Sequence, residues 1–331
     1  MKIYGIDFAM EKFDVNFLDL DGREKHLIVA NKIGSITKFL EKIPKDSLLC
    51  AEHTGVYGNL LVFLCNQLSI PISLSSGYSI KHSLGLLKGK SDKLDARRIR
   101  EYGERFADKL KLSKCDCENL QELNELYLLR NQLVKERKMI STQQLGKKYN
   151  PYNSISVQRI AIKLISTLNE SISEIEVEIL NIIESDKELK KSFELSTSVK
   201  GVGPITTCDL IIKTGNFKRI DTARKASSYA GTCPFPNSTG KMVKKDKVSH
   251  MSDKALKTLL HLCSKSAVQH NKEYKLYYQK KKQEGKPHYL ILNNISNKLL
   301  RTIYSVVANG IPYSQNYICS DPRNNEKKLV S

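Results

Sequence analysis

Short segments within the first thirty residues either alternate between apolar and polar residues or run apolar, and this pattern predicts β-strands. The expected strands cover residues 2–8, 13–20 and 25–30, and the short break between the first two indicates a β-hairpin. Helical and strand patterns alternate after that. They predict a helix, a short buried strand, a second helix and a further strand, over residues 33–43, 47–52, 57–68 and 70–74. Three early strands followed by alternating helices and strands are typical of an α/β domain with a mixed sheet.

The pattern then changes to apolar positions three and four residues apart, which is the spacing of amphipathic helices. Residues 92–110 fit one such helix. Two much longer runs, over residues 118–148 and 155–194, predict an antiparallel helical hairpin of the coiled-coil type with its tip near residues 149–154. Residues 199–331 show mostly helical patterns, and their final stretch is polar and expected to be loose.

The two halves of the chain differ in net charge. The 54 Lys and Arg against 35 Asp and Glu give a net charge of +19 with His neutral. Residues 199–331 carry 24 of the basic residues against 8 acidic ones, whereas residues 1–198 carry 30 against 27. A basic half joined to a nearly neutral half indicates a polyanionic partner, most often a nucleic acid. The alternative is a lysine-rich surface that only keeps the protein soluble.

Composition narrows the class of protein further. At 331 residues the chain is long enough for two domains, and 40% hydrophobic with 27% charged residues is the composition of a globular protein. No run of about 18 apolar residues is present, so no membrane span is expected. The chain opens on a strand pattern rather than a signal peptide, and its eight cysteines include no C-x-x-C pair, which leaves a zinc site without support. We therefore expect a cytoplasmic protein with reduced cysteines.

Four carboxylates stand out at the ends of predicted elements. Asp7 lies on the first strand within G-I-D-F-A, and Glu52 ends a later strand within A-E-H-T-G. Asp92 and Asp95, within S-D-K-L-D-A-R, are three residues apart and share one helical face. Clustered carboxylates are ligands of hard divalent cations, and two Mg²⁺ ions about 4 Å apart can activate a nucleophile and stabilise a leaving oxygen in phosphoryl transfer. Each acid taken singly also fits a turn or a helix cap, but Asp7 has apolar neighbours that favour burial of its strand.

Two motifs of the basic half can contact phosphate. V-K-G-V-G-P at residues 199–204 is similar to the turn of a helix-hairpin-helix, whose backbone N–H groups bind phosphate without reading sequence, or it is an ordinary interhelical turn. A-G-T-C-P-F-P-N-S-T-G-K at residues 230–241 is a lysine-rich loop in which Ser238 and Thr239 precede a glycine. A serine hydroxyl can attack phosphorus if cations stabilise its alkoxide. The alternative for this segment is a surface turn.

A third basic segment, residues 274–289, interleaves tyrosine with lysine as Y-K-L-Y-Y-Q-K-K-K-Q-E-G-K-P-H-Y. Such a sequence suits neutralisation of a phosphate backbone together with stacking on bases. A lysine-rich helix with its tyrosines on the core side explains the pattern equally well.

Together these motifs resemble the IS-110/IS-1111 family of DEDD transposases over nearly the whole chain, residues 1–315. G-I-D-F-A, A-E-H-T-G-V-Y and K-S-D-K-L-D-A-R match the family's acid set residue for residue, at Asp7, Glu52, Asp92 and Asp95. The resemblance implies that these four residues are catalytic and bind Mg²⁺, as two ions. It also implies the fold class: an α/β RuvC-like (ribonuclease-H-fold) domain, a helical coiled-coil insertion and a mainly α carboxy-terminal domain with a helix-hairpin-helix-like element.

The carboxy-terminal motifs resemble the family's second domain, which carries a nucleophilic serine. Members commonly place that serine directly before the glycine, where this chain has Thr239, and Ser238 comes one residue earlier. We take Ser238 as the catalytic nucleophile and Thr239 as the alternative. The segment K-V-S-H-M-S-D-K-A-L-K at residues 247–257 also matches the family, in a region expected to contact nucleic acid. The expected nucleic-acid-binding residues are Lys200, Gly201, Gly203, Lys241, Lys244, Lys245 and Lys247.

The resemblance implies a recombinase encoded by an insertion sequence, which cleaves and exchanges strands of two double-stranded DNAs, donor and target. A 5′-phosphoserine link would keep the phosphoester energy, so no ATP is needed. The family further implies a structured non-coding guide RNA, so that the protein itself reads mainly backbone. Since Ser238 and the acids lie far apart in sequence, they must meet across domains, which implies a homo-oligomer, a dimer or a tetramer.

Four segments are expected along the chain. They are a RuvC-like metal-binding domain over residues 1–112, a helical hairpin over 113–196, a basic transposase domain over 197–315 and a flexible tail over 316–331.

Three other functions remain open. A metal-dependent nuclease of the Holliday-junction type would keep the acids and use water as the nucleophile. An actin-like ATPase or sugar kinase would need further glycine-rich phosphate loops, and none occurs between residues 100 and 198. A non-catalytic nucleic-acid binder would not depend on the acids at all.

Overall fold

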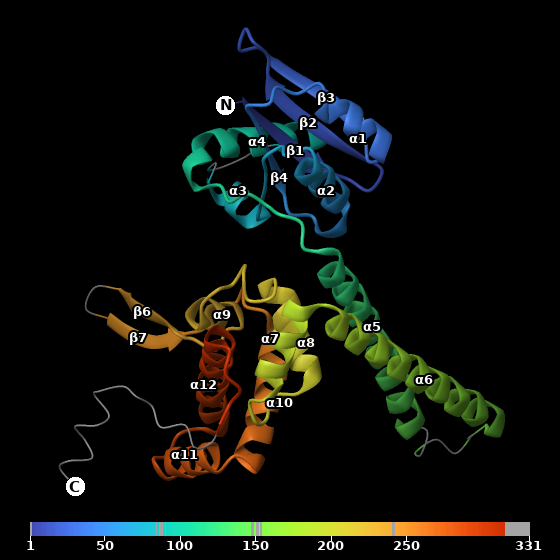
Figure 1. Ribbon diagram of the computed structural model, residues 1–331, viewed down its shortest axis with the longest axis vertical. Coiled ribbons are helices and arrows are strands. Elements are labelled where there is room, and N and C mark those ends of the chain that lie inside the picture. The colour runs from blue at the N-terminus through green and yellow to red at the C-terminus, as the bar shows by residue number, and fades with distance from the viewer. Residues whose placement is uncertain are drawn as a thin grey trace. The chain divides into compact units, whose positions relative to one another are not determined.

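Figure 1 shows the computed structural model of the chain, coloured from blue at the amino terminus to red at the carboxy terminus. The structure describes residues 2–83, 85, 89, 91–146, 149, 152, 154–239 and 242–314, with residues 237–239 and 242–246 described by their backbone. The chain divides into two compact units, Met1–Asp116 and Cys117–Ser331. The finer domain boundaries expected near residues 112, 196 and 315 stay a prediction.

The first unit is built on a five-stranded mixed sheet in the order β3-β2-β1-β4-β5. Its strands are β1 (Lys2–Phe8), β2 (Lys12–Leu18), β3 (Glu24–Ala30), β4 (Ser47–Glu52) and β5 (Ile72–Ser75). β2 pairs antiparallel with both β1 and β3, whereas β4 pairs parallel with β1 and β5. The predicted hairpin and the predicted mixed sheet are therefore confirmed.

Helices cover both faces of this sheet (Figure 1). The helical elements of the unit are α1 (Ile33–Leu40), η1 (Gly55–Gly58), α2 (Asn59–Gln67), α3 (Gly77–Ser83), α4 (Asp92–Arg105) and η2 (Ala107–Lys109). Side chains of α1 and α2 share a core with Ile6 and Phe13, and α4 contacts β1, β2 and β4 through Ile99 and its neighbours. The short helix α3 is not predicted by the sequence pattern, because its seven residues bury only Ile80.

The second unit begins with the predicted helical hairpin, made of α5 (Glu118–Gly146) and α6 (Ile155–Ser185). Leu123 of α5 and Ile179 of α6 are buried between the two helices. The expected helix over residues 155–194 is wrong in one respect, since a separate helix α7 (Lys187–Thr197) follows α6. Asp186 causes the break, because its carboxylate accepts hydrogen bonds from the Glu188 and Leu189 amides and caps α7. Of the expected tip, the structure describes Tyr149, Tyr152 and Ser154.

The remainder of the second unit is mostly helical, as predicted. Its helices are α8 (Pro204–Thr214), α9 (Ala223–Tyr229), α10 (Lys254–His270), α11 (Lys272–Gln283) and α12 (His288–Asn309). α12 is the centre of this part: its apolar face, including Ile295 and Leu299, packs with residues of α7, α9, α10 and α11. The fold class expected from the sequence is thus confirmed in its α/β, hairpin and helical parts.

Part of the segment expected to be a loop at residues 230–241 is instead a β-strand. β6 (Phe235–Thr239) pairs antiparallel with β7 (Met242–Lys247), and the register joins Ser238 to Val243. The two strands project from the helical part between α9 and α10 (Figure 1). Short polar strands of this kind are missed because their sequences lack the alternation of apolar and polar residues that predicts a strand.

Two further expectations concern the membrane and the tail. Among the helices of the described residues, none combines the length and the apolar character needed to cross a bilayer. The loose tail expected after residue 315 lies outside the described residues.

Candidate active site

Sheet register brings the first two acids to one edge of the sheet. β1 and β4 run parallel as neighbours, with Ile6 opposite Ala51, so Asp7 and Glu52 follow at adjacent positions near the carboxyl ends of both strands. On the other side of β1, Asp7 lies directly opposite Asp14 of β2. Carboxyl ends of parallel strands are where sheets of this kind place their functional side chains.

A glycine contact brings the other two acids to the same place. A Cβ atom at Gly5 would overlap the Ala96 carbonyl oxygen and the Arg100 amide nitrogen, so α4 lies directly against the backbone of β1. The Leu94 amide donates to Ser91 Oγ at 3.3 Å, which caps α4 and fixes where the helix begins. Asp92 and Asp95 consequently lie in the first turn of α4, close to Asp7. The four residues Asp7, Glu52, Asp92 and Asp95 are hereafter the acidic tetrad.

The electrostatics of Asp7 show that the acidic tetrad gathers around it. Burial raises the pKa of Asp7 most, and the negative charges of Asp95, Asp92, Glu52 and Asp14 raise it further, to about 7. Like charges within a few ångströms disfavour ionisation of each other, and a half-buried carboxyl has too little water to offset this. A carboxyl group with such a pKa among other carboxylates is a candidate for a functional centre.

Neighbouring side chains hold the rest of the tetrad. Arg98 Nη1 donates to Asp95 Oδ1 at 2.8 Å, and Lys12 Nζ lies 3.7 Å from Asp92 Oδ2. Gly77 borders Glu52 so closely that a Cβ atom there would overlap the Glu52 carboxylate. The lack of a side chain at Gly77 therefore leaves room for the Glu52 carboxylate. The sequence pattern does not show that these two residues lie side by side.

The chemistry of the tetrad fits a divalent metal, since its acidic oxygens are the donors that hard cations prefer and a cation would relieve their repulsion. Within the described residues, no three His, Cys, Asp or Glu side chains stand close enough together to hold an ion as they are. The assignment of the four acids as metal ligands therefore stays a prediction.

One buried acid beside the tetrad was not identified from the sequence. Asp14 is 3% exposed, its Oδ1 lies 2.6 Å from His26 Nε2, and its Oδ2 lies 3.4 Å from Lys12 Nζ. The alternation of F-D-V-N-F on β2 could have indicated Asp14. An antiparallel hairpin that pairs Asp14 with Asp7 puts both side chains on the same face of the sheet. Whether Asp7 and Asp14 lie opposite each other depends on the register between β1 and β2, which the sequence pattern does not determine.

The candidate phosphate-binding turn lies between α7 and α8 in the second unit. Lys200 is exposed there, and Gly203 is the N-cap of α8 with Pro204 at its first position. Gly201 has φ +99°, and a Cβ atom on it would collide with Ala267 of α10. Gly201 is thus required for packing against α10, a reason that applies with or without nucleic acid.

The candidate nucleophile lies on the β6–β7 hairpin. Ser238 and Thr239 are the last two residues of β6, Lys244 and Lys245 lie on β7, and Lys247 ends β7 with an exposed side chain. Lys241 lies outside the described residues. The tetrad belongs to the unit Met1–Asp116 and Ser238 to the unit Cys117–Ser331, so their roles as one catalytic set stay a prediction.

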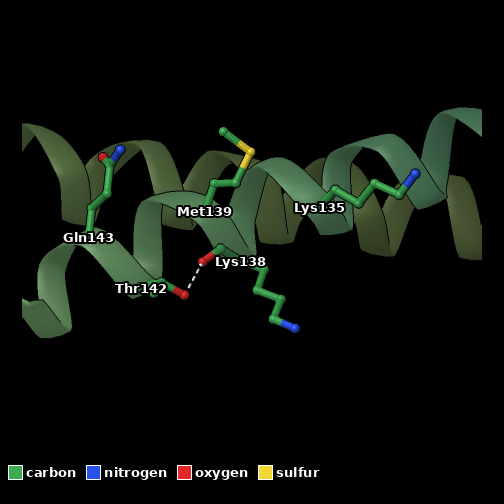
Figure 2. A pocket seen from close by; sticks show the side chains of 5 residues that line it. All are labelled: Lys135, Lys138, Met139, Thr142 and Gln143. Atoms are coloured by element: carbon green, nitrogen blue, oxygen red, sulfur yellow. Dashed lines mark hydrogen bonds between the residues drawn. The ribbon is translucent and has the colours of Figure 1, made fainter.

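Figure 2 shows a shallow hollow on α5, lined by Lys135, Lys138, Met139, Thr142 and Gln143. The Thr142 hydroxyl donates to the Lys138 carbonyl oxygen at 2.8 Å, which is a bond within the helix. The lining holds no acid and no nucleophile beside a base, so it has no catalytic arrangement. The acidic tetrad remains the candidate centre.

Stability of the metal-free chain is expected to fall as pH rises from 4 to 7. The folded pKa of Asp7 is raised above its unfolded value, so the folded state binds more protons in this window and loses stability as they leave. Asp7→Asn removes this loss. In EDTA, the melting temperature of the variant should exceed that of the wild type by a margin that grows with pH and reaches a few degrees at pH 8.

The measurement is thermal unfolding of both proteins from pH 4 to pH 8. Adding Mg²⁺ at pH 8 should raise the melting temperature of the wild type more than that of Asp7→Asn. A difference between the two proteins that does not change with pH would contradict the assigned environment of Asp7.

Two family models match separate parts of the chain. A family model of DEDD transposases of the IS110 type, described as "Transposase", matches residues 4–146, and a second model, "Transposase IS116/IS110/IS902 family", matches residues 194–279. The pilin gene-inverting proteins of Moraxella bovis and Moraxella lacunata are 24% and 25% identical to this chain over 325 residues, 94% of this chain and 97% of each relative.

Two further similarities cover a smaller share of the chain. The insertion element IS110 uncharacterized 43.6 kDa protein of Streptomyces coelicolor is 24% identical over 117 residues, 35% of this chain and 29% of that protein. The solved structure of RuvC from Thermus thermophilus aligns with a TM-score of 0.26 and 14% identity, over 34% of this chain and 100% of that chain.

Proposed function

The chain belongs to the IS116/IS110/IS902 family of transposases, enzymes that recombine DNA, and we propose that it cleaves and exchanges DNA strands through a 5′-phosphoserine link at Ser238. The observation that carries the proposal is the environment of Asp7, where burial and the negative charges of the other three tetrad members raise its pKa to about 7. Such a centre has the chemistry of metal-assisted phosphoryl transfer.

The acidic tetrad would hold the divalent metal, which we take to be two Mg²⁺ ions. Bound there, the ions would supply positive charge at the scissile phosphate and the departing oxygen. Asp7 would be the central ligand, because it lies at the end of the middle strand with Glu52 on the neighbouring strand and Asp95 on α4 above it. The Arg98 contact would hold Asp95 in position.

Ser238 would supply the nucleophile. Its Oγ loses a proton and attacks phosphorus, the new Oγ–P bond forms as the P–O3′ bond breaks, and the 3′ oxygen takes up a proton. The 3′ hydroxyl of the incoming strand then attacks the phosphoserine and releases the serine. One phosphoester replaces another at each step, so the exchange consumes no ATP. Thr239 remains the alternative nucleophile.

The partners proposed are two DNA duplexes and a structured guide RNA, within the cytoplasm where that DNA lies. The net basic character of residues 199–331 supports a polyanionic partner. The names of the two Moraxella relatives support inversion or relocation of a DNA segment as the outcome. The tetrad and Ser238 belong to different units of the chain. We propose that the protein acts as an oligomer in which one subunit supplies the tetrad and another supplies Ser238.

A second candidate function is a junction-cutting nuclease that uses water. It is favoured by one observation: the whole tetrad belongs to the first unit, which needs no serine for hydrolysis. Hydrolysis would leave no covalent protein–DNA product.

The test uses duplex DNA that spans the ends of the element encoding this chain, labelled at the 3′ end of the cleaved strand. The full chain is incubated with this DNA, Mg²⁺ and the transcript of the non-coding DNA beside the gene. We expect recombinant strands together with a labelled product that migrates with the protein on a denaturing gel. Cleavage without that product would favour the nuclease, and equal recombination without the transcript would remove the guide RNA from the proposal.

A further inference from the structure

A lysine-rich surface on α11 and the start of α12 takes no part in the proposed chemistry. Residues 272–301 carry eight Lys and Arg but only two acidic side chains. Within the described part of the chain, Lys281 is the only one of these basic residues in an ion pair, with Glu284 Oε2 at 2.7 Å. Five further lysines are exposed there without a carboxylate partner, so the positive charge is not balanced locally. They are Lys272, Lys275, Lys280, Lys282 and Lys286.

Aromatic rings join the two helices of this surface. Lys298 Nζ lies 4.7 Å from the ring centroid of Tyr277, and Lys281 Nζ lies 5.9 Å from the same centroid. Tyr278 Oη and His288 Nδ1 are 2.8 Å apart, which links α11 to the first residue of α12. The His288 ring meets the Tyr289 ring edge to face at 5.3 Å. These four rings and the lysines around them are hereafter the aromatic–lysine surface.

The structure separates the two interpretations that the sequence of this segment left open. Tyr274 is 5% exposed and packs in the core, as expected of a lysine-rich helix with tyrosine on its inner side. Tyr289 is 71% exposed, as are Leu290, the next residue of α12, and Leu276 of α11. An exposed ring on a surface that also carries unpaired lysines offers a stacking face together with positive charge.

We propose that the aromatic–lysine surface binds an unpaired DNA strand, with a base stacked on Tyr289 and the phosphates along the lysines of α11. Bases in a duplex are already stacked and paired, so a single exposed tyrosine selects unpaired nucleotides. Exchange of strands between two duplexes frees such strands, because cleaved ends must leave one partner before they join the other. The proposal rests only on the DNA recombination of the family and not on Ser238, the metal or the guide RNA.

The test is fluorescence anisotropy of the full chain with a labelled 20-nucleotide oligo-dT, a duplex and an oligo-U of the same length, without Mg²⁺. Tyr289→Ala should weaken binding of oligo-dT by about 5- to 100-fold, the range of one lost base stack, and should leave duplex binding within about twofold. Tyr289→Phe should bind like the wild type, because it keeps the ring. Tyr149→Ala removes an equally exposed tyrosine, at 85% exposure, from another part of the chain and should change nothing.

A second variant tests the charge separately. Lys280→Gln with Lys282→Gln should reduce the salt dependence of oligo-dT binding by about 1.4 in the slope of log K against log salt, since each single-strand phosphate contact contributes about 0.7. Unchanged oligo-dT binding by Tyr289→Ala, or an equal loss for duplex, would overturn the proposal. Tighter, Tyr289-dependent binding of oligo-U than of oligo-dT would overturn the choice of DNA.

Discussion

Asp7→Asn is expected to abolish metal-dependent strand cleavage, by at least about 10³-fold, while the chain stays folded and still binds DNA. Asparagine keeps the size of the side chain and removes its charge, so the sheet around β1 is not disturbed. The neutral amide cannot take the place of a central anionic ligand between Glu52 and Asp95. The same change also removes the repulsion that raises the pKa of Asp7, so the variant should be no less stable than the wild type.

The measurement is the single-turnover rate of cleavage of labelled element DNA with Mg²⁺. Asp19→Asn is the matched control, because Asp19 lies in the turn after β2, where it accepts hydrogen bonds from the Asp21 and Arg23 amides. Asparagine can accept the same bonds, so the control should cleave like the wild type. Cleavage at wild-type rate by Asp7→Asn would remove the tetrad from the mechanism.

Ser238→Ala is expected to eliminate the covalent protein–DNA product and leave DNA affinity unchanged within about twofold. One hydroxyl contributes little to an affinity that phosphate contacts dominate. A hydroxyl is a poor nucleophile unless its proton is removed and its alkoxide stabilised, and residues 233–245 contain no His, Asp or Glu. Activation must then come from the tetrad, so Ser238→Ala and Asp7→Asn should block the same step.

A denaturing gel of 3′-labelled DNA with each variant and Mg²⁺ makes the measurement. Thr239→Ala should be the milder change, because the extra methyl group of threonine crowds an in-line attack. Ser166→Ala is the control serine, because Ser166 lies on α6, where its hydroxyl donates to Glu170 Oε1 at 3.1 Å on an exposed face. Persistence of the adduct in Ser238→Ala with loss in Thr239→Ala would transfer the role to Thr239.

Much of the first unit follows from local sequence. Alternating or continuous apolar residues predicted the β-hairpin, and a short apolar run predicted the buried strand that carries Glu52, because each strand must present apolar residues to a core. Helical spacing predicted α4 and the α5–α6 hairpin for the same reason. The sequence also identified the four acids, since carboxylates at strand and helix ends are visible without any knowledge of packing.

Prediction of secondary structure from the local sequence failed at two places. One is a helix break set by a single side chain, and the other is a hairpin of polar strands. The long helix expected over residues 155–194 is interrupted because Asp186 can satisfy two amides of α7 better than a continuing helix would. The sequence of the β6–β7 hairpin has no alternation of apolar and polar residues, and so it gives no periodic signal. Neither feature alters the hydrophobic pattern that sequence interpretation depends on.

The sequence by itself therefore indicated most of the elements, offered the four acids and Ser238 as candidate site residues, and showed that the second half is basic. Only the tertiary structure decided that the charges of the other acids act on Asp7. Gly5 lets α4 lie against the backbone of β1 and so brings Asp95 to Asp7, which is 88 positions earlier in the chain. The hairpin register adds the buried Asp14 opposite Asp7. The pKa of Asp7 depends on burial and on charges from distant segments, and these are fixed by packing rather than by neighbours in sequence.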